Sequence, residues 1–369
     1  MISKERLTSR FLEMIQVYSP SKGEKEMADW IEDYLAKRGI SFQSDHAGEA
    51  YGGNGRNIVA FIPGTKKGIP LGFAAHMDQI EPCRNVKAIQ EGDIIRTDGT
   101  TTLGGDDKSG ITAILEAVED LLETNAEHRD IYLVFTSSEE ISMMGTKHMD
   151  LDMLPCKDLV IADATGDTGV IAYKAPGMEA IRVVFHGKKA HAGIEPEKGI
   201  NAIKVAAEAI SNMHIGRIDP ETTSNIGRIE GGSATNIVTD EVEFTAEIRS
   251  HSMEKLAAEV AHMEKCCQDA AKAYGASCEF IHEPAYPTLS LDLDCDLVKE
   301  TVKAMEAEEI RPDLQVIGGG SDANVLAGHG YRSVILGLGM RNVHTVEESL
   351  DINEVWKAAR VMRRMMDGD

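Results

Sequence analysis

Four short apolar runs, each leading toward a histidine or an acidic side chain, constrain the fold of this chain most strongly. The runs occupy residues 71–75, 131–135, 159–162 and 334–337. The groups that follow them are His76, Glu139, Glu140, Asp163 and His344, and a glycine-rich loop is expected between the last run and His344. Such runs are typical of strands buried inside an α/β sheet, and open α/β sheets bind ligands just beyond the carboxyl ends of their strands. The sequence therefore predicts an α/β sheet with a functional site built from these groups.

Composition argues against several classes of protein. The chain has 369 residues, enough for one large domain or two. It carries 38 Lys and Arg against 61 Asp and Glu, and the net charge of −23 argues against nucleic acid and anionic membranes as partners. Six cysteines without a CxxC pair indicate reduced thiols. Because no signal-like or membrane-length apolar run occurs, a cytoplasmic protein is expected.

The spacing of apolar residues divides the chain into a large α/β part and an insertion. Helical spacing predicts helices over residues 7–15, 28–35 and 108–122, and alternation with turn signals predicts a strand at 57–62. From residue 178 the pattern becomes strand, helix, two strands, helix and strand, which is the ferredoxin-like order. Because His344 must rejoin the earlier groups, we expect an α+β domain at 175–284. It would be inserted between the two parts of an α/β domain at 1–174 and 285–369.

His76 and Asp78 lie two residues apart at the end of a predicted strand, a spacing that places both side chains on one face. The imidazole can ligate a metal ion while the carboxylate orients it. Taken alone, such a pair more often contains a structural histidine. The metal interpretation therefore depends on the other groups that the sheet brings to the same edge.

Asp106 follows two glycines and opens the helix predicted from residue 108. Glycine permits a close approach of the backbone, and a helix N-terminus stabilises an anion. Two interpretations follow: Asp106 caps the helix, or its carboxylate bridges two metal ions. The second interpretation gains weight only from the neighbouring groups.

Glu139 and Glu140 are adjacent carboxylates at a predicted strand end, and like charges there are costly unless a cation compensates them. One can bind metal while the other acts as a general base, although an exposed acidic turn would also explain the pair. Asp163 and His344 are uninformative when taken singly. Together with His76 and Asp106, these groups form a set of nitrogen and oxygen donors without a thiolate, which suits two ions of Zn, Co or Mn.

These motifs resemble the M20 family of di-zinc peptidases and amidohydrolases, most of all its peptidase T-like branch. The matching segments are His76-Met-Asp78, Gly105-Asp106-Asp-Lys, Ser138-Glu139-Glu140, Asp163 and His344-Thr345. The resemblance implies an α/β, mixed-sheet zinc-exopeptidase catalytic domain with an inserted ferredoxin-like α+β lid domain. It also implies that His76, Asp106 and Asp163 hold one zinc ion, and that Asp106, Glu140 and His344 hold the other. Asp78 would orient His76, and Glu139 would be the general base.

The resemblance extends to the insertion and to a glycine-rich segment beyond it. His191 lies in a segment similar to the lid motif whose histidine polarises the scissile carbonyl, and Asn236 lies in one whose asparagine holds substrate. Arg249 resembles a carboxylate-binding arginine, although an edge-strand surface charge is the simpler interpretation. Ser321 ends a segment that is similar to a peptidase T segment and is expected to touch substrate. That segment carries an arginine in peptidase T where Gly318 stands here, which puts tripeptide specificity in question.

The resemblance implies hydrolysis of short peptides by an aminopeptidase that attacks with a water held between two zinc ions. An M20-type deacylase or carboxypeptidase would use the same site, and a metal-binding scaffold would not require Glu139. A serine or cysteine hydrolase is disfavoured because no GxSxG motif occurs. The family also leads us to expect a homodimer formed through the lid domain, in which His191 completes the partner's site. The alternative is a monomer whose own lid closes to bring His191 over the metals.

Overall fold

The computed structural model describes residues 1–368, which separate into two compact units. The first unit comprises Met1–Lys174, Ser290–Ile317 and the described part of Ser321–Asp369. The second unit comprises Ala175–Leu289 together with Gly318–Gly320. Each unit has its own hydrophobic core and is described separately.

The larger sheet has twelve strands and a mixed arrangement. Its main path is β1-β2-β6-β3-β7-β16-β17-β5-β4, and β8 pairs with β14, β15 and β16. The strands are β1 Ser41–Ser44, β2 Ile58–Ile62, β3 Leu71–His76, β4 Ala88–Glu91, β5 Ile94–Thr97, β6 Ile131–Thr136, β7 Asp158–Thr165, β8 Val170–Ala175, β14 Leu289–Ser290, β15 Asp313–Val316, β16 Arg332–Arg341 and β17 Ser349–Asp351.

The helices of the first unit cover this sheet and complete its core. They are α1 Lys4–Met14, α2 Lys25–Lys37, α3 Ala47–Ala50, α4 Gly105–Thr124, α5 Met144–Lys147, α8 Asp296–Ala307, α9 Asp322–Gly328 and α10 Ile352–Asp367, with a 3₁₀ turn η1 at Leu151–Met153. Helices α4 and α10 pack against each other, α4 also contacts β3 and β7, and α10 also contacts β16. The strands β6, β3, β7 and β16 are mutually parallel in that order, and their apolar side chains are buried. Such continuous burial explains why these strands appear in the sequence as uninterrupted apolar runs.

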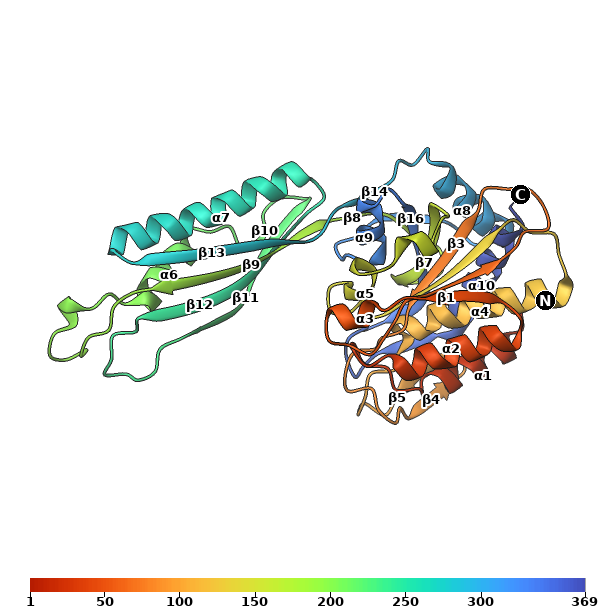
Figure 1. Cartoon of the computed structure of the whole chain (residues 1–369), viewed down its shortest axis with the longest axis horizontal. Coiled ribbons are helices and arrows are strands. Elements are labelled where there is room, and N and C mark those ends of the chain that lie inside the picture. The colour runs from red at the N-terminus through yellow and green to blue at the C-terminus, as the bar shows by residue number, and fades with distance from the viewer. Residues whose placement is uncertain (369) are drawn as a thin grey trace. The chain divides into compact units, whose positions relative to one another are not determined.

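The second unit is a five-stranded antiparallel sheet with two long helices on one face (Figure 1). Its elements are β9 Gly177–His186, the 3₁₀ turn η2 Pro196–Lys198, α6 Ala202–Ser211, β10 Gly216–Arg217, β11 Thr222–Gly231, β12 Glu241–Ser250, α7 Met253–Tyr274 and β13 Ser277–Tyr286. The strand order is β10-β11-β12-β9-β13. The ferredoxin-like order predicted from the sequence is confirmed, with the short β10 added.

Local sequence signals explain where the helices of the second unit begin and end. Ser252 caps α7, because its side chain accepts a hydrogen bond from the Lys255 amide, and Gly275 ends the helix with a φ of 69°. A left-handed backbone conformation at this position favours glycine. Asn201 caps α6 in the same way, accepting from the amides of Ile203 and Lys204.

Three details differ from the sequence-based expectations. The glycine-rich stretch before His344 is not a loop: strand β16 continues to Arg341, and the pairing with β7 shifts register at Gly337. Asp163 lies inside β7 rather than after it. The helix predicted over 108–122 extends across Gly105–Thr124, but Asp106 and Asp107 have non-helical backbone angles. Within residues 1–368, no helix has the length and apolar character needed to cross a membrane.

Candidate active site and metal centre

The parallel strands bring the predicted groups to one edge of the sheet. His76 is the last residue of β3, Asp163 lies near the end of β7, and Glu139 and Glu140 follow β6. His344 follows β16. The carboxyl ends of these four strands point the same way, because the strands are parallel. The start of α4 adds Asp106, so residues far apart in the sequence form one cluster.

Asp106 lies between the two histidines and presents one carboxylate oxygen to each. Its Oδ1 is 2.9 Å from Nε2 of His76, and its Oδ2 is 3.2 Å from Nε2 of His344. On one side, Oδ1 of Asp163 lies 3.8 Å from Nε2 of His76. On the other, Oε2 of Glu140 lies 2.9 Å from Nε2 of His344. The cluster therefore has two halves that share one carboxylate.

Asp78 is fully buried behind His76 and holds both the ring and the following acidic pair. Its Oδ1 is 3.3 Å from Nδ1 of His76 and accepts from the Glu139 amide at 2.9 Å. Its Oδ2 accepts from the Glu140 amide at 3.2 Å and from the Ser21 hydroxyl at 2.7 Å. Burial opposes ionisation, but these donors outweigh it and lower the pKa of Asp78 below its ordinary value. The carboxylate fixes the ring so that Nε2 faces Asp106.

The remaining carboxylates of the cluster are electrostatically crowded. Burial, followed by repulsion from Asp163, raises the pKa of Glu139 well above its ordinary value. Burial and the Asp106 charge raise the pKa of Asp163 in the same way. Hydrogen bonds to Asp106 and Glu140 raise the pKa of His344 to about 10. For Asp106, burial is outweighed by the two imidazoles, and its pKa is lowered.

This crowding of carboxylates is what a site for divalent cations requires, because bound cations would compensate the repulsion between them. In each of two groups of side chains, one donor atom per residue lies within 4.8 Å of the others: His76, Asp106 and Glu140 form one group, and His76, Asp107 and Asp163 form the other. Both groups contain His76, so they overlap with the two halves that share Asp106 without coinciding with them. Oε1 of Glu140 is buried, and no hydrogen-bond partner for it occurs among the described residues. Buried carboxylates without partners are costly unless a cation compensates them. The donor set of imidazoles and carboxylates matches a metal-dependent centre.

Asp107, which sequence reasoning left without a role, supports the cluster from behind. Its Oδ1 accepts from the Gly110 amide at 3.1 Å, and its Oδ2 accepts from the His76 amide at 3.1 Å. Asp107 thus makes the amide contact that a helix cap makes, whereas Asp106 has an extended ψ of 105°. The capping interpretation considered for Asp106 therefore belongs to its neighbour.

Glu348 is a second residue that the sequence did not reveal. Its carboxylate accepts hydrogen bonds from the amides of Leu103, Gly104 and Asp106 at 2.7–3.0 Å. The side chain is buried, and burial raises its pKa to about 6. Glu348 therefore holds the glycine loop that positions Asp106. No motif marks it in the sequence, because its partners are backbone amides more than 240 residues away.

Two further buried carboxylates form hydrogen bonds that hold the end of β6 and the turn after it. Oε1 of Glu24 accepts from the amide and hydroxyl of Ser138, the residue before Glu139, whose φ is 51°. Asp322 accepts from the hydroxyls of Thr136 and Thr146 at 2.5 and 2.6 Å. The turn after β6 is therefore fixed from two sides.

The residues expected to bind substrate are divided between the two units. Ser321 belongs to the first unit, where its buried hydroxyl caps α9 by accepting from the Ala323 amide at 3.3 Å. In the second unit, His191 and Asn236 are neighbours, because the Ala192 amide donates to the Asn236 carbonyl at 2.9 Å. Arg249 also lies in the second unit, where its guanidinium grips both oxygens of Glu247 at 2.9 and 3.0 Å and reaches the Gly318 carbonyl at 3.4 Å.

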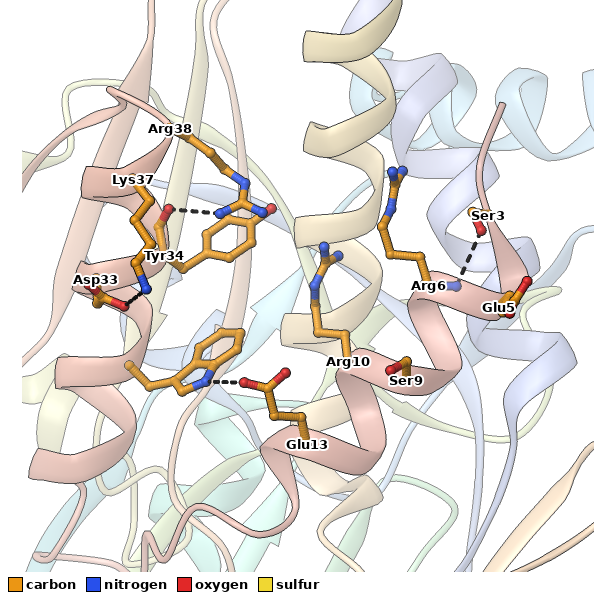
Figure 2. Close-up of a pocket in the computed structure, with 11 residues that line it drawn as sticks. Ser3, Glu5, Arg6, Ser9, Arg10, Glu13, Asp33, Tyr34, Lys37 and Arg38 are labelled. Carbon is orange, nitrogen blue, oxygen red and sulfur yellow. Dashed lines mark hydrogen bonds and ion pairs between the residues drawn. The ribbon is translucent and has the colours of Figure 1, made fainter.

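A large depression in the first unit lies elsewhere, beside α1 and α2. Figure 2 shows its basic and aromatic lining, and its volume is about 830 Å³. Its arginines are already paired: Arg6 and Arg10 contact Glu116, and Arg38 contacts Glu119. Because these charges are neutralised within the protein, the depression does not compete with the metal centre as a functional site.

Comparisons with known proteins identify relatives of the chain. Residues 173–275 match the family model of the peptidase dimerisation domain, and residues 57–174 match that of peptidase family M28. A protein from Bacillus subtilis, YqjE, is 41% identical over 98% of both chains. A peptidase T from Exiguobacterium is 30% identical over 73% of this chain and 66% of its own length.

Solved structures give the same result. The aminopeptidase PepT from Bacillus cereus superposes with a TM-score of 0.94 at 37% identity, covering 100% of this chain and 99% of that one. A tripeptidase from Staphylococcus aureus superposes with a TM-score of 0.97 at 34% identity, covering 100% and 98%. A dinuclear metal-binding M20 peptidase from Bacillus subtilis shares the fold at 18% identity and a TM-score of 0.77. With this cluster of metal-compatible side chains at its strand ends, the chain belongs to the M20 family of metallopeptidases, in its peptidase T-like branch.

Proposed function

We propose that this metallopeptidase removes N-terminal residues from short peptides, most of all tripeptides, with two zinc ions at the strand-end cluster. The observation that carries the proposal is that Asp106 offers one carboxylate oxygen to each half of the cluster. The buried Glu139, in the turn after β6, is close enough to Asp163 for the two charges to repel each other. The substrate class is supported by relatives named as an aminopeptidase and a tripeptidase, which match over nearly their whole length.

Each half of the cluster offers donors for one ion. His76, Asp106 and Asp163 would hold the first, and Asp106, Glu140 and His344 would hold the second. Bound ions would supply a Lewis acid that activates water and polarises the scissile carbonyl. Cobalt or manganese would fit the same nitrogen and oxygen donors, so the choice of zinc belongs to the proposal.

Residues of the chain itself would transfer the proton from the attacking water to the leaving group. The Glu139 carboxylate accepts a proton from the attacking water and passes it to the nitrogen of the leaving amine. Its backbone is held by the bond from its amide to Asp78, and Ser138 before it is held by Glu24. Asp78 also orients His76, so one buried carboxylate positions both a proposed ligand and the proposed base.

In the second unit, His191 is the residue we propose to contact the carbonyl oxygen of the substrate. Its Nδ1 accepts from the Gly193 amide at 3.2 Å, which places the ring proton on Nε2. The ring is exposed, so this N–H can donate to a developing negative charge. Asn236 lies beside it and is proposed to hold the substrate backbone.

Two other predicted contacts gain less support. Arg249 would have to exchange Glu247 for a substrate carboxylate, and Gly318 supplies no side chain that could share this task. The Ser321 hydroxyl is buried and engaged as a helix cap.

A substrate panel tests the proposed function. The metal-stripped protein would be reloaded with Zn, Co or Mn and assayed on free tripeptides, free dipeptides, N-blocked peptides and N-acyl amino acids. We expect fastest cleavage of free tripeptides and none of the N-blocked forms. Preferential hydrolysis of N-acyl amino acids would replace the aminopeptidase with a deacylase, and activity without any metal would contradict the centre itself.

We also propose that the chain forms a homodimer through the second unit. The proposal is supported by the match of residues 173–275 to the peptidase dimerisation domain. Light scattering after gel filtration should give about twice the mass of one chain, 40.1 kDa. A monomer at all concentrations would contradict the proposal without affecting the metal centre.

A further inference from the structure

The second unit contains a cluster of metal-compatible side chains that the proposed peptidase reaction does not use. His214 follows α6, whereas Glu259, His262 and Cys266 lie on α7. Residues three and four apart share one face of a helix, so these three side chains line the same stripe. The loop after α6 places His214 against that stripe.

The distances within this cluster are short. Nδ1 of His214 is 3.1 Å from Oε2 of Glu259, and the rings of His214 and His262 are stacked with centroids 4.1 Å apart. One donor atom from each of His214, Glu259 and His262 lies within 4.8 Å of the other two. Sγ of Cys266 lies 3.6 Å from Nε2 of His262.

Glu259 supplies a second, independent observation. Its residue surface is only 7% exposed, and Oε2 is directed toward His214. The other oxygen, Oε1, is buried, and no hydrogen-bond partner for it occurs among the described residues. A buried carboxyl group with one oxygen unsatisfied is costly, because the hydrogen bonds that this oxygen makes to water are lost and not replaced. A cation bound next to Oε1 of Glu259 would remove this cost.

We propose that His214, Glu259 and His262 bind one divalent transition-metal ion of the zinc class, separate from the strand-end centre. Two imidazoles and one carboxylate are a donor set that zinc accepts, and Cys266 lies near enough to His262 to serve as a fourth ligand. Zinc bonds of about 2.0–2.3 Å hold tetrahedral ligand atoms roughly 3.3–3.7 Å apart. His214 and Glu259, at 3.1 Å, are already close enough, and a donor pair at the 4.8 Å limit would have to contract by roughly 1 Å.

The His214 side chain permits this contraction. A ring nitrogen binds an ion in the plane of its ring, so the stacked His214 and His262 rings must turn relative to each other. The His214 side chain is 57% exposed and is joined to a loop rather than to α7, so it can rotate without displacing the core. Glu259 and His262 are one helical turn apart on α7 and need no backbone change.

Metal counting tests this site on the whole chain. The protein would be stripped with a chelator, titrated with zinc and freed of loosely bound metal, and its zinc content would be measured against protein concentration. We expect the wild type to retain one equivalent more than either His214→Gln or His262→Gln. Because the His214 side chain is exposed, its replacement should leave the fold intact, and circular dichroism of both variants checks this.

His282→Gln is the matched control. Nδ1 of His282 is 3.0 Å from Oε2 of Glu179, also in the second unit, so this pair resembles His214 and Glu259 but lacks a second histidine. Its variant should retain the full metal content of the wild type. Equal zinc contents in the wild type and in both cluster variants would overturn the proposal. The role of His214 would then be limited to its contact with the Glu259 carboxyl group.

Discussion

The chain gathers histidines and carboxylates at two places, and the two places are built differently. In the first unit, the donors come from the ends of parallel strands and are held by buried carboxylates that contact backbone amides. In the second unit, the donors come from one helix face and a loop, and Glu259 is the buried member of the three. The first cluster is therefore rigidly positioned, which chemistry requires, whereas the second can bind an ion but lacks a positioned base.

Removal of metal should have the largest effect on the activity that depends on the first cluster. Stripping the protein with a chelator should abolish peptide hydrolysis, because the reaction has no other group that can activate water as strongly. Zinc added back should restore it. The measurement is hydrolysis of a free tripeptide before stripping, after stripping and after reloading. Activity that survives complete removal, verified by elemental analysis, would break the assignment of the first cluster.

The next largest effect should separate Glu139 from Glu140. Glu139→Gln should retain metal but lower kcat by at least about 10²-fold, because a positioned general base contributes about 10²–10⁴. Glu140→Gln should lose metal, because its Oε2 shares the half of the cluster that contains His344. Zinc content and kcat measured on both variants decide the question. The reverse pattern would exchange the two roles.

Replacing Glu348 should show how strongly the first cluster depends on the hydrogen bonds that hold the Asp106 loop. Glu348→Gln removes a charged acceptor from three amides, and losing a hydrogen bond to a charged group costs roughly 1.5–3 kcal/mol of stability. Loss of such supporting contacts commonly lowers metal affinity about 10–100-fold. The neighbouring Glu347 is exposed, and Glu347→Gln is the matched control. Urea unfolding and zinc titration should distinguish the two variants, and identical behaviour would remove Glu348 from the site.

The last prediction concerns the pH dependence of stability in the metal-free protein. The pKa values of Glu139, Asp163 and His344 are raised in the folded state, so the folded chain binds more protons than the unfolded chain. Stability of the metal-free protein should therefore fall as pH rises from about 5 to 9, by about 1.4 kcal/mol per pH unit for each extra proton bound. Bound zinc should weaken this dependence, because it displaces those protons. Urea midpoints across this range measure both forms, and a rise of metal-free stability with pH would contradict the crowding of the cluster.

Most of the fold could be predicted from the sequence because its signals are local. Apolar runs predicted the buried strands, and alternation with helical spacing predicted the β-α-β-β-α-β order of the second unit. Those same runs marked His76, Glu139 and Glu140, since a ligand at a strand end follows directly from the strand. The glycine-rich stretch before His344 was misread as a loop, because glycine is also tolerated where a strand changes register.

What the sequence by itself determined is the set of residues that a parallel sheet would carry to its edge, together with the family that they resemble. Only the tertiary structure decided that Asp107 rather than Asp106 makes the capping contact, that Glu348 holds the Asp106 loop, and that His214 meets Glu259 and His262. The physical reason is that these contacts join a single side chain to backbone amides or to a distant helix. Such contacts leave no periodic pattern in the chain, and only folding brings the partners together.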